Sequence, residues 1–274
     1  MKIFNSISDF LVDRNSASPI VYVPTMGNLH EGHLSLIKKG KELGGQIITS
    51  IFINPLQFNN KKDLDNYPKT LNSDIQFLKR SGCNYLYLPD DKSILNNIEK
   101  VKASKKSKKL CGLNRPGHFD GVVTILNRFF NQINPDIVIF GKKDYQQYLI
   151  VKDLINDKKF NIKLIGSETI RDKNGLALSS RNNLLSNEQK KIASELYKTL
   201  KDINKKKKSL SQDLLDKKID NLSSLGFEVD YLTLCNAETL EDSYEIRSNN
   251  LLLAIAATIN DIRLIDNIIL DKLS

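Results

Sequence analysis

Short apolar runs alternate with amphipathic stretches between residues 20 and 165, and this rhythm limits the possible folds more than any other feature. The apolar runs predict strands, and the stretches with apolar residues at helical spacing predict helices. The predicted strands are 20–23, 47–53, 85–88, 137–140 and 162–165, and the predicted helices are 33–43, 71–81, 122–132 and 145–155. Continuous apolar runs such as 47–53 are typical of strands buried on both faces of a parallel sheet. We therefore expect an α/β fold with a Rossmann-like, doubly wound parallel sheet and right-handed crossovers.

The rhythm changes after residue 168. Two polar helices are predicted at 187–204 and 210–225, and strands follow at 229–234, 251–256 and 263–264. This order is typical of a smaller α+β domain with an antiparallel sheet. A chain of 274 residues is long enough for two modest cores, so we predict two domains, 1–168 and 169–274.

The cysteines and the N-terminal residues bear on the compartment. Cys83, Cys111 and Cys235 are odd in number and scattered, which disfavours a disulfide framework or a zinc ribbon. Asp9 and Asp13 interrupt the N-terminus before an apolar segment could develop, so a secretory signal is not expected. No apolar run approaches the roughly 20 residues of a membrane span. The expected location is the reducing cytoplasm.

The formal net charge of +9 raises the question of a nucleic-acid partner, because clustered cations release counterions from phosphates. The excess lies in two lysine-rich stretches, 100–109 and 205–208, and neither is interleaved with aromatic residues that would stack on bases. We interpret both as solvated surface and predict no nucleic-acid partner. The overall positive field would equally favour small anionic substrates.

The loop after the first predicted strand contains two of the three histidines, His30 and His33, in the pattern H-x-G-H. Gly27 and Gly32 have P-loop spacing, but the Lys–Ser/Thr pair of a P-loop is missing, and the histidines do not have the H-E-x-x-H spacing of zincins. Ligands of open α/β sheets bind where strands end, and helix N-termini favour phosphate. The loop therefore predicts a phosphate site with two imidazole donors, and two structural histidines at a helix cap are the alternative.

Three more loops suit a ligand site. Two of them follow strands, where ligands of such a sheet bind, and the third lies just past the domain junction. Gln57 follows the second strand and offers a neutral amide that can bridge two substrates, unless it belongs to an ordinary turn. Segment 141–147 combines glycine, cations and a carboxylate, which suits phosphate and ribose recognition. Residues 178–181 offer two hydroxyls and a guanidinium for phosphate oxygens, with a serine-rich linker as the alternative.

A further turn, 115–121, leads into the most apolar predicted helix. Arg115 could hold an anion, whereas His118 is expected to be a packed or capping histidine. No serine or cysteine lies on an elbow of the G-x-S-x-G type, so covalent catalysis by the protein is not expected.

Five segments resemble the pantothenate synthetase (pantoate–β-alanine ligase) family, in the family's order and over essentially the whole chain. They are PTMGNLHEGH at 24–33, FINPLQF at 52–58, RPGHFDG at 115–121, GKKDYQQ at 141–147 and GLALSSRN at 175–182. The H-x-G-H motif alone is shared by a whole nucleotidyltransferase superfamily, whereas five ordered motifs are specific. Asn28 stands where the family usually has Ala, and Lys142 where it often has Glu, so altered detail with unchanged chemistry is expected.

The resemblance implies an enzyme, an amide-forming ligase that joins pantoate and β-alanine to pantothenate with ATP as a substrate. Pantoate would attack the α-phosphorus to give pantoyl adenylate and pyrophosphate, and β-alanine would then release AMP. Mg²⁺ is expected to accompany the triphosphate, with no protein ligand named for it. The family also suggests a homodimer and a C-terminal domain that acts as a lid over the adenylate. Another H-x-G-H adenylyl- or cytidylyltransferase, acting on a phosphorylated small molecule, is the alternative.

The resemblance also implies roles for particular residues. His33 would be the catalytic proton donor, Gln57 would contact both pantoate and β-alanine, and Gln147 would contact pantoate. The expected ATP-binding residues are Met26, Gly27, Asn28, Leu29, His30, Glu31, Gly32, His33, Gly141, Lys142, Lys143, Asp144, Ile170, Leu178, Ser179, Ser180 and Arg181.

Overall fold

Two compact units make up the chain. The computed structural model describes residues 1–15, 17–243 and 250–270. The first unit comprises residues 1–108, 112–142 and 147–168, and the second contains everything from residue 169 onward together with 109–111 and 143–146. The expected division after residue 168 did not include these two short segments, because nothing in their composition separates them from their neighbours.

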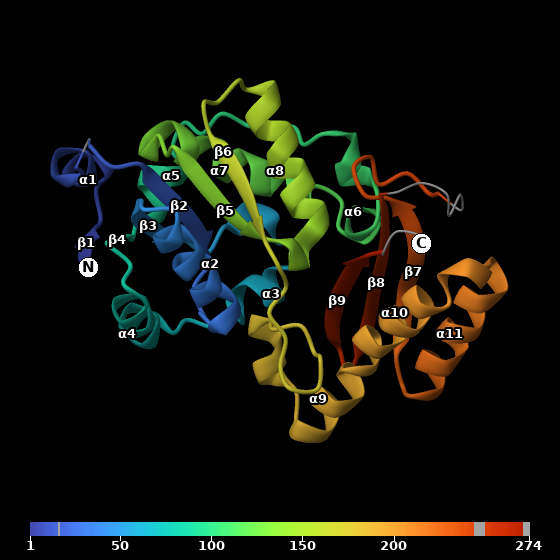
Figure 1. Ribbon diagram of the computed structural model, residues 1–274. Helices are drawn as coiled ribbons and strands as arrows, with labels where there is room; N and C mark the ends of the chain where they lie inside the picture. Colours follow the sequence, from blue (N-terminus) through green and yellow to red (C-terminus); the bar gives the residue numbers. More distant parts are fainter. Residues whose placement is uncertain (16, 244–249, 271–274) are drawn as a thin grey trace. The chain divides into compact units, whose positions relative to one another are not determined.

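A six-stranded sheet forms the centre of the first unit (Figure 1). Its strands are β1 (Lys2–Phe4), β2 (Ile20–Thr25), β3 (Gln46–Ile51), β4 (Tyr85–Tyr87), β5 (Ile137–Gly141) and β6 (Lys163–Ser167). The order is β1-β4-β3-β2-β5-β6, and the strand pairs are parallel throughout, which confirms the predicted fold class. Because β3 and β5 lie on opposite sides of β2, the strand order reverses between β2 and β5. Ligands of open α/β sheets bind at such a switch point.

Helices cover both faces of this sheet, because side chains of successive strand residues alternate between the faces. Val21 and Val23 share one core cluster with Leu36 of α2 (Glu31–Glu42) and Leu78 of α4 (Leu71–Ser81). Tyr22, between the two valines, meets Phe129 of α7 (His118–Ile133) with ring centres 6.0 Å apart. The helices up to residue 157 are α1 (Ile7–Asp13), α2 (Glu31–Glu42), α3 (Lys61–Asp65), α4 (Leu71–Ser81), α5 (Asp91–Leu95), α6 (Cys111–Asn114), α7 (His118–Ile133) and α8 (Tyr145–Asp157), with 3₁₀ turns η1 (Pro55–Gln57), η2 (Lys105–Lys108) and η3 (Lys142–Asp144).

The lysine-rich stretches are only partly solvated. Lys106, in η2, is half-buried and its Nζ atom lies 2.8 Å from the Asp153 carboxylate, so this lysine belongs to an ion pair and not to a solvated loop. In the second stretch Lys205 is exposed and Lys207 is half-buried, while the side chain of Lys208 lies outside the described residues.

The second unit is built on an antiparallel sheet of three strands, which confirms the predicted α+β part (Figure 1). The strands, in the order β7-β8-β9, are β7 (Glu228–Asn236), β8 (Leu251–Ile259) and β9 (Ile262–Ile269), and the helical segments are η4 (Ser180–Leu184), α9 (Asn187–Ala193), α10 (Glu195–Lys205), η5 (Lys207–Ser209) and α11 (Gln212–Ser224). Leu200 of α10 and Leu215 of α11 are buried in one core with Leu253 of β8. Within the described ranges, no helix is both long and apolar enough to cross a membrane.

The single helix expected over 187–204 is wrong in one respect, because α9 and α10 are separate helices that meet at Ser194. The Ser194 hydroxyl donates to the carbonyl oxygen of Lys191 at 2.6 Å. Such a bond from a side chain to the preceding turn competes with the helical pattern and bends helices. The apolar periodicity runs through this position without interruption, so it did not reveal the break.

Candidate active site

The loop between β2 and α2 lies at the carboxyl end of β2, next to the switch point. The chain turns here through two residues in the left-handed region, Gly27 with φ of 82° and Asn28 with φ of 51°. A Cβ atom on Gly27 would lie 3.1 Å from Oδ2 of Asp74 and 3.2 Å from Cγ2 of Ile51, so a larger residue would be strained by φ and would require these neighbours to shift. Asparagine tolerates the left-handed conformation better than most residues, which explains why an asparagine can stand at position 28.

The two histidines of this loop cap α2 reciprocally. The Gly32 N–H donates to Nδ1 of His30 at 3.1 Å, and the His30 N–H donates to Nδ1 of His33 at 3.3 Å. A backbone N–H can only donate, so both Nδ1 atoms are acceptors and the proton of each neutral ring lies on Nε2. The ring centres are 4.1 Å apart. The capping role considered as the alternative is therefore present, and it fixes the tautomer in which Nε2 can donate to a phosphate.

The Gln57 amide is held in a defined orientation at the end of η1. Its Oε1 atom accepts from Nδ2 of Asn54 at 3.0 Å, and its Nε2 atom lies 3.1 Å from Sδ of Met26. The side chain is half-buried. Because Met26 precedes the H-x-G-H loop, this contact joins the loop after β3 to the loop after β2 within the first unit.

Asn54 ties the same turn to α7. Its Oδ1 atom accepts from the Leu56 N–H at 3.0 Å, and its Nδ2 atom also donates to the carbonyl oxygen of Gly121 at 3.1 Å. A Cβ atom on Gly121 would lie only 2.1 Å from the Leu56 carbonyl oxygen, so only glycine allows this approach of helix and turn. The side chain of Gln57 is thus positioned by a buried asparagine and by the backbone of α7.

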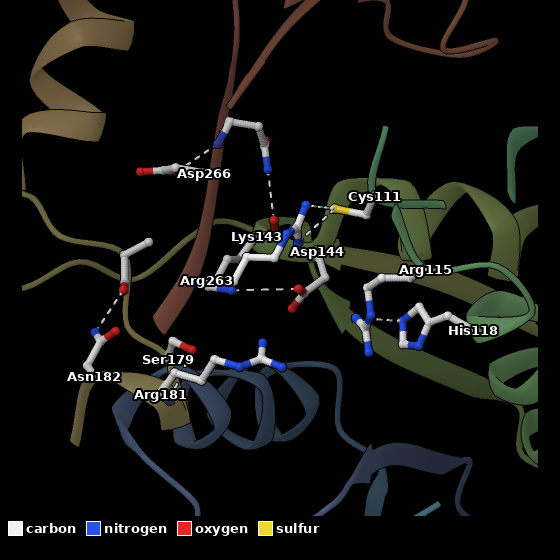
Figure 2. Close-up of polar contacts among 12 residues, drawn as sticks. Cys111, Arg115, His118, Lys143, Asp144, Ser179, Arg181, Asn182, Arg263 and Asp266 are labelled. Atoms are coloured by element: carbon white, nitrogen blue, oxygen red, sulfur yellow. Dashed lines mark hydrogen bonds and ion pairs between the residues drawn. The ribbon is translucent and has the colours of Figure 1, made fainter. Parts of the chain in front are cut away.

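His118 and Arg115 contact the backbone of the same turn, and Figure 2 shows the contact between their two side chains. The Nη1 atom of Arg115 lies 3.1 Å from Nε2 of His118, and Nδ1 of His118 lies 2.7 Å from the carbonyl oxygen of Gln57. A guanidinium can only donate, so Nε2 accepts and Nδ1–H donates to the carbonyl. His118 is buried, and its ring packs edge-on against Phe119. The expectation of a packed histidine agrees with this burial.

The segment after β5 is divided between the two units. In the first unit Lys142 pairs with Glu168 at 2.6 Å, so the cation found where the family often has Glu is compensated locally. In the second unit the amide of Gln146 accepts from the Cys111 N–H at 3.1 Å and donates to the carbonyl oxygen of Lys109 at 2.6 Å. Gln146 is therefore structural, whereas Gln147 is half-buried on α8.

A small pocket, open to solvent, lies within the second unit and carries three cationic side chains, which Figure 2 labels. Its lining residues are Lys143, Leu176, Ala177, Ser179, Arg181, Leu196, Arg263, Leu264, Ile265 and Asp266. Asp266 is bidentate with Arg171, and Arg263 pairs with Asp230 at 2.6 Å. Within the described part of the chain no carboxylate pairs with Arg181, so an anion would not compete with a protein carboxylate for this guanidinium.

The backbone that carries Lys143 is anchored to β9. Asn267 donates from Nδ2 to the carbonyl oxygen of Lys143 at 2.8 Å. Arg263, also on β9, places Nη1 and Nη2 3.6 Å from Sγ of Cys111, which lies 3.1 Å from the hydroxyl of Tyr231. Burial, followed by the neighbouring Cys111, raises the pKa of Tyr231 well above 10.0, so this phenol stays protonated.

Comparison with known proteins identifies the family. The family model described as pantoate-beta-alanine ligase matches residues 2–269. A pantothenate synthetase from Marinomonas sp. (strain MWYL1) is 40% identical over 282 residues, which cover 98% of this chain and 99% of that protein.

Solved structures agree. A pantothenate synthetase from Thermus thermophilus superimposes with a TM-score of 0.93 at 31% identity and covers 99% of this chain and 100% of its own. A pantoate-beta-alanine ligase from Francisella tularensis, complexed with beta-gamma ATP and beta-alanine, gives a TM-score of 0.83 at 34% identity, with 98% and 97% covered.

The chain belongs to the pantoate–β-alanine ligase family.

The residues expected for a pantoate–β-alanine ligase fall into groups, each within one unit. In the first unit the structure holds His30 against His33 and brings Met26 into contact with Gln57. In the second unit Lys143, Ser179 and Arg181 line one pocket. Ile170, Leu178 and Ser180 do not line it; the Leu178 N–H donates to the Ile170 carbonyl at 2.9 Å, so these two residues shape the loop through their backbones. Asp144 is exposed.

Three residues that were not expected from the sequence contact the expected site residues or line the pocket with them. Asn54 and Asp74 are buried polar side chains that bond to the loops after β3 and β2, and Arg263 is the third cation of the pocket. Asn54 had a detectable signal, since it precedes Pro55 at the start of a turn. Asp74 and Arg263 lie on a helix and a strand far from the motifs along the chain, so only the folded structure reveals them.

Proposed function

We propose that this chain ligates pantoate and β-alanine to pantothenate with ATP, through a pantoyl-adenylate intermediate. The observation that carries the proposal is the reciprocal cap of His30 and His33 at the start of α2, which uses both Nδ1 atoms as acceptors and places the proton of each neutral ring on Nε2. The neutral amide of Gln57 is held on the adjoining loop. The Francisella tularensis relative complexed with beta-gamma ATP and beta-alanine supports the choice of substrates.

In the first step a carboxylate oxygen of pantoate attacks the α-phosphorus of ATP, and the bond from that phosphorus to the α,β-bridging oxygen breaks. Negative charge moves onto the departing pyrophosphate. His33 donates from Nε2 to this developing charge, while its Nδ1 atom is occupied by the N–H of His30. A donor fixed before the reaction stabilises the transition state without reorganisation. His30 has the same tautomer and acts on neighbouring phosphate oxygens.

In the second step the amine of β-alanine attacks the acyl carbon of the adenylate. The bond from this carbon to the AMP oxygen breaks, the amine loses a proton and AMP departs. Gln57 contacts both organic substrates, which a neutral group able to donate and accept can do. Gln147 contacts pantoate; its neighbour Gln146 already bonds through both amide atoms to the backbone of 109–111, which favours Gln147 as the ligand-binding member of the pair.

Lys143, Ser179 and Arg181 bind phosphate oxygens of ATP, which their shared cationic pocket supports. Magnesium enters with ATP as part of the substrate, held by phosphate oxygens and water. No group of three or more His, Cys, Asp or Glu side chains among the described residues could hold a metal ion. The lid role of the C-terminal part, the homodimer and the cytoplasmic location stay predictions.

A product assay tests the proposal. ATP and magnesium are supplied with pantoate alone, with β-alanine alone and with both. Pyrophosphate release should require pantoate, and AMP release should also require β-alanine. Cleavage of ATP to ADP and phosphate would contradict the adenylate mechanism. A nucleotide joined stably to a phosphorylated compound, with no AMP released, would instead favour another H-x-G-H nucleotidyltransferase.

A further inference from the structure

A carboxylate outside every motif holds the H-x-G-H loop. Asp74, in the first turn of α4, has only 1% of its surface exposed. Its Oδ2 atom accepts from the Asn28 N–H at 3.0 Å, and its Oδ1 atom accepts from the Leu29 N–H at 2.8 Å. The two amides are consecutive, and they immediately precede His30. The carboxylate thus binds the backbone at the point where the chain leaves the left-handed turn and enters α2.

Burying the Asp74 carboxylate is unfavourable, so its hydrogen bonds to the loop must compensate for the lost hydration. Among the described residues no Lys, Arg or His pairs with Asp74, so its charge is compensated by hydrogen bonds alone. An unpaired buried charge is unfavourable unless such bonds satisfy it. The two backbone bonds to Asp74 hold the H-x-G-H loop in place, and they add nothing to the hydrogen bonds within α4 itself.

Thr70 shows that the surroundings are arranged around the carboxylate. It occupies the N-cap of α4, where a threonine hydroxyl ordinarily accepts from the helix backbone, but this side chain makes no capping bond. Its hydroxyl donates instead to Oδ2 of Asp74 at 3.0 Å. Helix α4 therefore lacks a side-chain cap from Thr70, and the Asp74 carboxylate has a third donor that helps to fix its orientation.

We propose that Asp74 is a positioning residue for the adenylation step, which sets the entry of the chain into α2 and thereby the place of the His30 and His33 Nε2 atoms. This inference rests on the proposed function of the two histidines. Small displacements of a catalytic donor are costly, since a misplacement of about 1 Å can lower a rate by about 100-fold.

The decisive variant is Asp74→Asn, which keeps the size of the side chain and removes one acceptor. Whichever way the amide turns, its NH₂ group faces the N–H of Asn28 or of Leu29, so one anchoring bond is lost. The matched control is Asp136→Asn. The Asp136 carboxylate accepts from the Ile20 N–H at 2.7 Å, which is the same chemistry at the opposite end of β2.

Three measurements are made on both variants of the full chain: single-turnover pyrophosphate release, ATP affinity by calorimetry, and hydrogen exchange of the amides of residues 28 and 29. Asp74→Asn should slow pyrophosphate release by about 10- to 100-fold, lower ATP affinity by a smaller factor and speed exchange at the two amides. Asp136→Asn should stay within about threefold of the wild-type rate. If Asp74→Asn fails to fold, Thr70→Val is measured, with a smaller loss in the same direction expected.

An Asp74→Asn rate within about threefold of wild type, or an equal loss in Asp136→Asn, overturns the proposal. If the wild-type chain releases no pantoate-dependent pyrophosphate, the proposed function fails. Amide exchange then decides the inference by itself: unchanged exchange at residues 28 and 29 in Asp74→Asn overturns it, and faster exchange there, absent from Asp136→Asn, supports the anchoring.

Discussion

The imidazole of His118 donates from Nδ1 to the backbone carbonyl of Gln57 across 2.7 Å, although 61 positions separate the two residues. The contact joins the first turn of α7 to η1, and the Arg115 guanidinium completes it by donating to the other ring nitrogen. The backbone of Gln57 is thus fixed independently of its side chain, which Asn54 orients.

His118→Ala should lower the free energy of unfolding by about 0.5–1.5 kcal/mol, because the Gln57 carbonyl loses its 2.7 Å donor and is left with Nη2 of Arg115 at 3.4 Å. His118→Asn places an amide donor near the former Nδ1 position and should recover part of this loss. Urea unfolding of the three proteins measures the effect. A His118→Ala protein as stable as wild type would show that this hydrogen bond contributes nothing net.

Gln57→Ala should weaken the binding of pantoate and β-alanine while ATP binding stays nearly intact. Losing one neutral hydrogen-bonding group costs about 0.5–1.5 kcal/mol, and more if its partner remains buried and unpaired. The control is Asn59→Ala, which removes an exposed amide from the same loop. Calorimetry with each substrate checks the prediction; a larger loss for ATP than for pantoate would assign Gln57 to the nucleotide.

The parallel sheet could be predicted because its central strands are continuous apolar runs of sufficient length. The edge strand β1 (Lys2–Phe4) could not, since three residues show no periodicity and only the pairing with β4 defines them as a strand. The start of α7 at His118 was also missed, because the turn before it has the composition of a loop. In both cases tertiary contacts determine the secondary structure, which the local sequence pattern does not specify.

The residues of the candidate site also fall into those that the sequence predicts and those that it does not. Loop residues such as His30, His33 and Gln57 are predictable, since they follow strands at the edge where ligands of this fold bind. Asp74 is not, because it acts through hydrogen bonds to backbone groups distant in the sequence. Asn54 could be recognised as the start of a turn, but its bond to the distant Gly121 carbonyl could not. Backbone groups carry no residue-specific signal, so the sequence does not reveal which side chain bonds to them.

Arg181→Ala should weaken ATP binding more than AMP binding, because the guanidinium is proposed to contact phosphates that AMP lacks. A hydrogen bond to a charged group contributes about 1.5–3 kcal/mol, so a loss of roughly 10- to 100-fold in ATP affinity is expected. Lys205→Ala, which removes an exposed cation from α10, is the control for net charge. Equal losses of affinity for ATP and AMP would show that Arg181 does not contact the phosphates that AMP lacks.

The Asp202 carboxylate should stabilise the second unit in a pH-dependent way. It bonds to Lys218 of α11 at 2.5 Å and to Lys206 at 3.1 Å, and these lysines lower its pKa below the ordinary 3.8. The folded protein then binds this proton less tightly than the unfolded chain does. The contribution is therefore fully present above about pH 4 and is lost as the pH falls through the lower folded value.

Asp202→Asn should accordingly cost about 0.5 kcal/mol at pH 7, a small figure because the group is partly exposed and screened by solvent. The cost should shrink toward pH 2–3, roughly where wild type is protonated as well. Asp216→Asn, which removes a carboxylate bonded to Gln212, should show no such trend. Urea unfolding across this pH range checks both; a pH-independent cost for Asp202→Asn would contradict the ion-pair explanation.

His33→Ala should lower the rate of adenylation far more than the affinity for ATP. As the α-phosphorus bond breaks, negative charge moves onto pyrophosphate, so a donor at the start of α2 acts more strongly in the transition state than in the ground state. Loss of such a donor or general acid costs on the order of 10²–10⁴ in rate. Removing the Nδ1 acceptor also frees the His30 N–H, so part of any stability loss comes from the cap.

His33→Asn separates the two roles, because its side-chain oxygen can accept from the His30 N–H while offering no Nε2 donor. It should therefore recover the cap but not the rate, and His30→Ala should resemble His33→Ala. Single-turnover pyrophosphate release, with ATP binding measured separately, distinguishes these outcomes. If His33→Ala binds ATP normally and forms adenylate within about threefold of wild type, the two histidines only cap the helix and the phosphate role is wrong.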